Sequence, residues 1–150
     1  MLLGSMVTSS AGWLSAVVSV PLGSCRRGSS AVELCNRNLC ALANNFAGAG
    51  FTPVIDWVIP DREQLDFFVS LLPDLHVLFV VLAPGIEACR YRNTIRAPRE
   101  RFDFDGYEDL DLGMKRELGG VGWWFDTAAL TPEETADRVI QEAGHRAVVS

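Results

Sequence analysis

Residues 76–83, HVLFVVLA, are the strongest strand pattern in the chain and decide its fold class. Every residue after His76 is apolar, and valine and phenylalanine, which favour extended backbone, make up half of the stretch. Pro84 follows, and its fixed φ and missing amide hydrogen suit the first turn of a helix. We therefore expect a strand here and a helix from Pro84 to about Arg96.

The residues before this strand predict a helix, a strand and a second helix. Residues 31–48 carry apolar side chains at helical spacing and end in glycines. Residues 51–59, FTPVIDWVI, are rich in β-branched and aromatic residues, which predicts a strand buried on both faces, with Asp56 inside it or at its end. Asp61 is expected to begin the next helix, which Pro73 ends.

After the helix that begins at Pro84, the chain first loses its apolar pattern and then recovers it. Residues 97–111 are dense in charges of both signs, which predicts a mobile, solvated segment leading to a short helix near 112–118. Residues 122–126, GWWFD, are expected to form a short strand. Residues 131–134, TPEE, are a capping box, which predicts a last helix to about Ala143.

Strands that alternate with helices indicate an α/β fold, because parallel strands need helical crossovers. The expected architecture is three-layer α/β/α with a mostly parallel sheet. Residues 1–30 are expected to be a diverged or poorly ordered N-terminal segment. Residues 31–150 are expected to form the domain, with an arginine-rich lid at about 92–111.

Composition limits the classes of partner. The chain has 150 residues and a formal net charge of −6, which does not favour a broad nucleic-acid-binding surface. It has no C-x-x-C pair, so a zinc finger or redox dithiol is not expected, and no metal-ligating cluster is expected either. No Lys or Arg precedes the apolar N-terminus, and there is no other run of 18 apolar residues, which favours a cytoplasmic protein with no membrane partner. The alternative is a secreted or lipid-anchored protein that is cleaved before Cys25.

Polar side chains at predicted strand ends are the first candidates for a site, since ligands of open α/β sheets bind at the carboxyl ends of the strands. These are Asp56, the residues after Ala83, and the pair Asp126 and Thr127. Asp56 could hold a metal or accept a proton from a substrate hydroxyl. The alternative is a structural aspartate that caps a neighbouring loop.

Five arginines lie within twelve residues, and this density is typical of phosphate binding by charge-assisted hydrogen bonds. The contacts we favour are Arg96, Arg99 and Arg101, which fall in the predicted mobile segment. The alternative is a solvated helix face whose charges pair at the surface. The other two arginines of the cluster are Arg90 and Arg92.

No intact phosphate-binding P-loop is present. Lys115 is the only lysine, and the residue after it is arginine rather than serine or threonine. A degenerate loop is conceivable at residues 23–30, GSCRRGSS, with Ser29 where the lysine would stand. Two glycines and a serine recur easily by chance in a stretch rich in serine and glycine, so this pattern is weak evidence for a phosphate-binding loop.

Three stretches taken together resemble P-loop nucleoside-triphosphate kinases of the chloramphenicol phosphotransferase-like type. They are residues 36–60, 76–93 and 120–140, and the resemblance covers about 31–143. It implies a five-stranded parallel sheet and transfer of the γ-phosphoryl group of ATP, with Mg²⁺, to a small-molecule hydroxyl. Relatives carry a first strand and an intact P-loop before residue 31, which this chain lacks; residues 7–20 are a candidate strand for that slot.

The resemblance also implies roles for individual residues. Asp56 matches a catalytic base or a water-mediated magnesium contact, although Trp57 stands where many relatives have a second acid. Asp126 and Thr127 match the strand end near the adenine. The lid that closes over phosphates matches Arg92, Arg96, Arg99 and Arg101.

The function expected from these observations is a kinase-like, ATP-binding protein with weak or no phosphotransferase activity. The nucleotide and an unidentified small-molecule acceptor are its expected ligands, and self-association through unpaired strand edges is a further expectation. The alternative is a non-catalytic α/β module that binds a nucleotide, a phosphorylated metabolite or a protein partner through its arginines.

Overall fold

The computed structural model describes residues 6–8, 14–19 and 28–150, and the chain divides into two compact units, each of which is described by itself. The first unit contains residues up to Ile59 and Glu63–Leu75, and the second contains Pro60–Arg62 and His76–Ser150. The elements of the first are β1 (Met6–Thr8), β2 (Leu14–Ser19), α1 (Gly28–Gly48), β3 (Thr52–Asp56) and α2 (Arg62–Ser70) without its first residue. Those of the second are β4 (Val80–Leu82), α3 (Ile86–Ile95), the 3₁₀ turn η2 (Pro98–Glu100), α4 (Tyr107–Leu118), β5 (Trp123–Phe125) and α5 (Pro132–Arg146).

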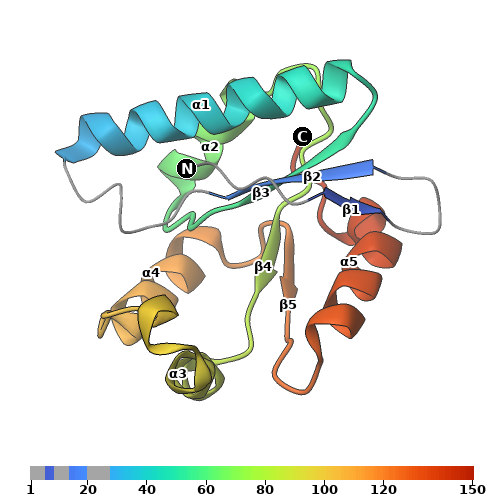
Figure 1. Cartoon of the computed structure of the whole chain (residues 1–150). Helices are drawn as coiled ribbons and strands as arrows, with labels where there is room; N and C mark the ends of the chain where they lie inside the picture. Colours follow the sequence, from blue (N-terminus) through green and yellow to red (C-terminus); the bar gives the residue numbers. More distant parts are fainter. Residues whose placement is uncertain (1–5, 9–13, 20–27) are drawn as a thin grey trace. The chain divides into compact units, whose positions relative to one another are not determined.

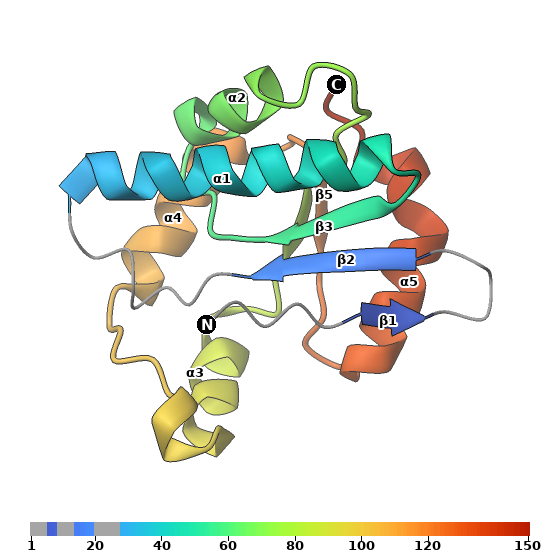
Figure 2. The ribbon, with the colours of Figure 1, turned by 45° about the horizontal axis from the view of Figure 1, so that its top comes forward.

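A three-stranded sheet in the order β1-β2-β3 underlies the first unit. β1 is antiparallel to β2, whereas β2 is parallel to β3, with Val17 opposite Val54. α1 connects the two parallel strands and runs alongside the sheet (Figures 1 and 2). β2 therefore lies directly beside β3, and it falls within residues 7–20, which the sequence offered as a candidate strand.

The buried face of α1 follows the helical period. Asn36, Leu39, Cys40 and Ala43 are each at most 4% exposed and stand at i, i+3, i+4 and i+7. The helix predicted for 31–48 is confirmed, although it begins three residues earlier, at Gly28. Burial raises the pKa of the Cys40 thiol to about 11, so this cysteine is neutral and packs as a small apolar residue.

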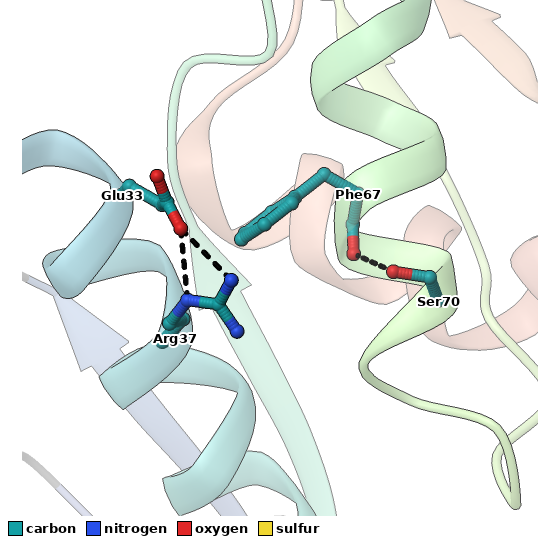
Figure 3. Close-up of polar contacts among 4 residues, drawn as sticks. All are labelled: Glu33, Arg37, Phe67 and Ser70. Carbon is teal, nitrogen blue, oxygen red and sulfur yellow. Dashed lines mark hydrogen bonds and ion pairs between the residues drawn. The ribbon is translucent and has the colours of Figure 1, made fainter. Parts of the chain in front are cut away.

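Two side chains of α1 contact α2 or the residue that follows it. The Arg37 guanidinium donates to the Glu33 carboxylate at 2.8 and 3.0 Å and lies 5.2 Å from the ring centre of Phe67 on α2 (Figure 3). Ser70 donates to the Phe67 carbonyl at 2.7 Å, and Asn44 donates to the Leu71 carbonyl at 2.9 Å. The Arg37–Phe67 contact therefore links α1 to α2, and the Asn44–Leu71 bond links α1 to the residue after α2; the other bonds lie within one helix.

Two expectations for this unit have different outcomes. The helix expected after Asp61 is confirmed, with Leu65 and Phe68 on its buried face. The prediction that the strand of residues 51–59 is buried on both faces is wrong, because β3 alternates between exposed and half-buried side chains and Val54 is 46% exposed. Successive side chains of a strand point to opposite faces, and one face of β3 is open.

In the second unit, β4 and β5 pair in parallel, with Val81 opposite Trp124. The chain end continues the pairing: the Phe79 amide donates to the Ala147 carbonyl at 2.8 Å, and the Val149 amide donates to the Val77 carbonyl at 3.0 Å. α5 lies on one side of the two strands, and α3 and α4 lie on the other (Figures 1 and 2). The described residues mix helices and strands, which is compatible with the expected α/β class, but their strands form one three-stranded and one two-stranded sheet and not a single mostly parallel sheet.

The predicted strand of residues 76–83 is only partly a strand, because β4 covers three of its residues. Residues 77–79 instead bond to the end of the chain in an antiparallel arrangement. The helix after it begins at Ile86 and not at Pro84, because Gly85 turns the chain with φ 86°. The short helix expected near 112–118 begins five residues earlier, at Tyr107.

The capping box of α5 is confirmed. The Glu134 amide donates to Oγ1 of Thr131, and the Thr131 amide donates to the Glu134 carboxylate. Pro132 occupies the first helical position, as its fixed φ allows. Local sequence therefore sets the start of α5 correctly.

α5 packs on β5 through a ladder of arginine and aromatic side chains. The rings of Trp123 and Phe125 are stacked at 4.5 Å, and both residues are at least 94% buried. Arg146 lies over Trp123, and Arg138 lies over Phe125. Glu142 accepts from both arginines, at 2.8 and 2.6 Å, and its pKa is lowered by the hydrogen bonds from Arg146 and then Arg138.

Replacing Leu118 tests the packing of the second unit. Leu118 is fully buried at the end of α4, so Leu118→Ala should lower the free energy of unfolding by about 2–5 kcal/mol. Leu112 on the same helix is 67% exposed, and Leu112→Ala should change it by less than about 0.5 kcal/mol. Urea unfolding followed by circular dichroism measures both, and equal effects would contradict the packing.

Acid should weaken the Glu142 ladder. The folded pKa of Glu142 lies below its ordinary value of 4.5, so its stabilisation is present above that pH and is lost as the pH falls through the folded value. Glu142→Gln should therefore lose less stability between about pH 5 and pH 3 than the unchanged chain. Asp137→Asn on the same helix is the control, and urea unfolding at each pH is the measurement.

Candidate functional site

The parallel pairing of β4 with β5 brings two strand ends to the same edge. The ladder continues one step further, since the Ala83 amide donates to the Phe125 carbonyl at 2.8 Å. After β4, Gly85 turns the chain into α3, and its positive φ would strain any residue with a side chain. After β5 come Asp126 and Thr127, as the sequence predicted for this edge.

Arg92 and Thr127 are brought together at this edge. One terminal nitrogen of the guanidinium donates to the Thr127 carbonyl at 2.6 Å, and the other lies 3.5 Å from its Oγ1. Thr127 is 2% exposed, and its carbonyl also accepts from the Leu130 amide at 3.2 Å. This charge-assisted contact joins α3 to the residue that follows β5.

Asp126 organises the turn after β5. Its Oδ1 accepts from the Ala128 amide at 2.8 Å, a side-chain to backbone bond typical of aspartate in turns. Asp126 is exposed, whereas the neighbouring Thr127 is buried. The residue expected near a nucleotide base therefore faces solvent and also supports its own loop.

Residues 93–102 form a closed loop, which we name the Arg loop. The Asn93 side chain donates to the Phe102 carbonyl and accepts from the Phe102 amide, both at 2.9 Å. Arg101 donates to the Arg96 carbonyl at 3.0 Å, and the Arg96 guanidinium lies 4.6 Å from the ring centre of Phe102. Residues 96–101 are exposed, as expected of a solvated segment. The Asn93–Phe102 bonds nevertheless close the base of the loop, and the Arg101–Arg96 bond crosses its middle.

Three guanidiniums stand on the surface of the Arg loop, those of Arg96, Arg99 and Arg101. The Arg99 side chain is 87% exposed, and its Nε lies 3.6 Å from the Glu100 carboxylate. An exposed pair of this kind contributes about 0–1 kcal/mol, so a stronger anion can replace it. Arg90 differs, because Glu87 and Glu108 both pair with it.

Asp56 belongs to the first unit, whereas the other six predicted site residues belong to the second. It is the last residue of β3 and is exposed, so the predicted strand-end position is confirmed. It lies opposite Ser19 of β2 in the parallel register. In the second unit, the structure joins Arg92 to Thr127 and Arg101 to Arg96.

The sole lysine has a structural partner. The Lys115 ammonium donates to the Asp111 carboxylate at 2.7 Å, one turn away on α4. The degenerate loop considered at 23–30 lies mostly outside the described residues, and its last three residues form the first turn of α1. Across residues 6–8, 14–19 and 28–150, no group of three or more His, Cys, Asp or Glu residues could hold a metal ion.

Sequence reasoning missed Asn93, the residue that closes the Arg loop. Its signal was present but weak, because asparagine near a helix end often bonds to backbone groups of a neighbouring turn. The partner nine residues away could not be read from local spacing. Asn93 therefore joins the candidate site as the residue that orders its arginines.

Comparisons with known proteins add no relative: no protein-family profile matches this chain, and neither the curated proteins nor the solved structures contain a match. In the described part of the chain, no helix combines the length and apolar character needed to cross a membrane.

Proposed function

We propose that this chain is a kinase-like, ATP-binding protein in which the Arg loop binds the phosphate groups and phosphoryl transfer is slow or absent. The observation that carries the proposal is the closed loop itself. Asn93 holds both backbone groups of Phe102, and three exposed guanidiniums stand on the six residues between Arg96 and Arg101. The resemblance to small-molecule phosphotransferases supplies the choice of ATP.

Guanidinium groups suit phosphate because their planar donors match two phosphate oxygens at once. A loop that is ordered before binding loses less conformational entropy when a ligand arrives. Two of the three arginines are already ordered by contacts inside the loop, Arg101 with the Arg96 carbonyl and Arg96 with the Phe102 ring. The Arg99 side chain is 87% exposed and therefore open to a ligand, and its guanidinium pairs with the neighbouring Glu100.

Fast transfer would need cations on the terminal phosphates, and the residues available do not favour it. P-loop enzymes place a lysine there, together with backbone amides and Mg²⁺. Lys115 is the only lysine of this chain and is paired with Asp111 on α4. In the described part of the chain, no three His, Cys, Asp or Glu residues gather where they could hold a metal ion such as Mg²⁺.

The same loop supports the alternative of a non-catalytic module that binds a nucleotide or a phosphorylated metabolite. Both functions need the arginines, but only transfer needs a group that accepts a proton from the acceptor hydroxyl. Asp56 is the residue we propose for that role, because it is an exposed carboxylate at the end of a strand that pairs in parallel. ATP turnover, measured beside ATP binding, separates the two functions.

Calorimetric titration with Mg·ATP tests the binding proposal. Arg99→Ala should weaken binding about 3- to 10-fold, because one charge-assisted contact is lost, and should make the affinity less dependent on salt. Arg116→Ala is the control, since this arginine is 74% exposed on α4 and pairs with its neighbour Glu117. No detectable binding by the unchanged chain, or equal effects of the two substitutions, would contradict the proposal.

Asp56→Asn tests the catalytic role. The substitution removes the proton-accepting carboxylate with little change in volume, so ADP formation above the buffer blank should disappear while the affinity for Mg·ATP stays within about 2-fold. Asp74→Asn, at another exposed position of the first unit, is the control. Turnover that persists in Asp56→Asn would remove Asp56 from the mechanism.

A further inference from the structure

We infer that Arg92 is a positioning residue, which holds α3 and the Arg loop at the carboxyl end of β5, and is not itself a phosphate ligand. The inference rests on the proposed function, because the ligand that the loop receives is a phosphate group. It assigns Arg92 a role different from that of Arg96, Arg99 and Arg101, with which the sequence grouped it. The distinction comes from what each guanidinium contacts.

The guanidinium of Arg92 is directed to protein atoms. It donates to the Thr127 carbonyl at 2.6 Å and approaches Oγ1 of the same residue at 3.5 Å. Thr127 is buried and Arg92 is half-buried, whereas the three arginines of the loop are exposed. A phosphate that took this guanidinium would remove the shorter, charge-assisted bond from the Thr127 carbonyl and leave it the longer bond from the Leu130 amide, at 3.2 Å.

Arg92 and Asn93 are neighbours on α3 and make contacts in two directions. Successive helical residues project about 100° apart, so one side chain can bond toward β5 while the next bonds to the loop. Arg92 holds the Thr127 backbone, and Asn93 holds the Phe102 backbone. A continuous series of contacts therefore runs from the end of β5, through α3, to the base of the Arg loop.

α3 depends on such polar contacts more than the other helices of its unit. None of its residues is buried, whereas α4 buries Leu118 and α5 buries Ala143. Tyr91 and Ile95 are both 65% exposed, so apolar packing contributes little on that face. The contacts that remain besides Arg92 include the pairing of Arg90 with Glu108 of α4.

Two readouts separate positioning from direct phosphate binding. The first is the hydrogen exchange of the Phe102 amide without ligand, because Asn93 accepts this hydrogen bond at the base of the loop. The second is the dependence of Mg·ATP affinity on salt, which becomes shallower when a direct phosphate contact is lost. A positioning residue changes the first readout and leaves the second unchanged.

We expect Arg92→Ala to speed exchange of the Phe102 amide and to weaken Mg·ATP binding about 3- to 10-fold without changing its salt dependence. Arg99→Ala should do the reverse, with normal exchange and a shallower salt dependence. Arg92→Lys keeps the positive charge but loses the planar guanidinium with its two terminal donors, so the Phe102 amide should also exchange faster in this variant than in the unchanged chain. This variant serves as the test if Arg92→Ala does not fold, as judged by circular dichroism.

Normal exchange together with a shallower salt dependence in Arg92→Ala would overturn the inference and make Arg92 a phosphate ligand. If the unchanged chain binds no Mg·ATP, the proposed function fails, yet exchange still decides the role of Arg92. Faster exchange would then support positioning of the loop, and unchanged exchange would overturn it. Arg116→Ala, which should alter neither readout, is the control for loss of one charge.

Discussion

The parallel pairing of β4 with β5 is the constraint on which the candidate site depends. Parallel strands cannot be joined by a tight turn, so the chain between Leu82 and Trp123 must cross over, and α3, the Arg loop and α4 all lie in that crossover. The same pairing places the turn at Gly85 and the residue Thr127 at one edge. Arg92 can reach Thr127 because both ends of the crossover are held by these two strands.

Stability within this unit is unevenly distributed. α5 is held on β5 by stacked aromatic rings, two arginines and Glu142, whereas α3 has no buried residue. Elements with little apolar burial open locally at low cost, and binding segments are commonly of this kind. The Arg loop therefore follows α3, the helix of its unit with the least apolar burial, and polar contacts decide how well the loop is ordered.

The sequence located the candidate residues better than it described their environment. Asp56, Asp126 and Thr127 were expected at strand ends and are there, since a strand followed by a turn is a local pattern. The four arginines were treated as one lid, but Arg92 contacts Thr127, thirty-five residues away, and the others belong to the loop. Contacts at such separation depend on strand pairing, which local spacing does not encode.

The sequence by itself determined the elements that rest on local chemistry. The capping box set the start of α5, helical periodicity marked α1, and strand–helix alternation indicated parallel pairing. Only the tertiary structure decided that residues 77–79 pair with the chain end, that one face of β3 is exposed, and that Asn93 closes the Arg loop. Each of these depends on which backbone groups, distant in the sequence, become neighbours in the fold. Backbone amides and carbonyls must find hydrogen-bond partners, and the fold, not the adjacent residues, decides which partners are within reach.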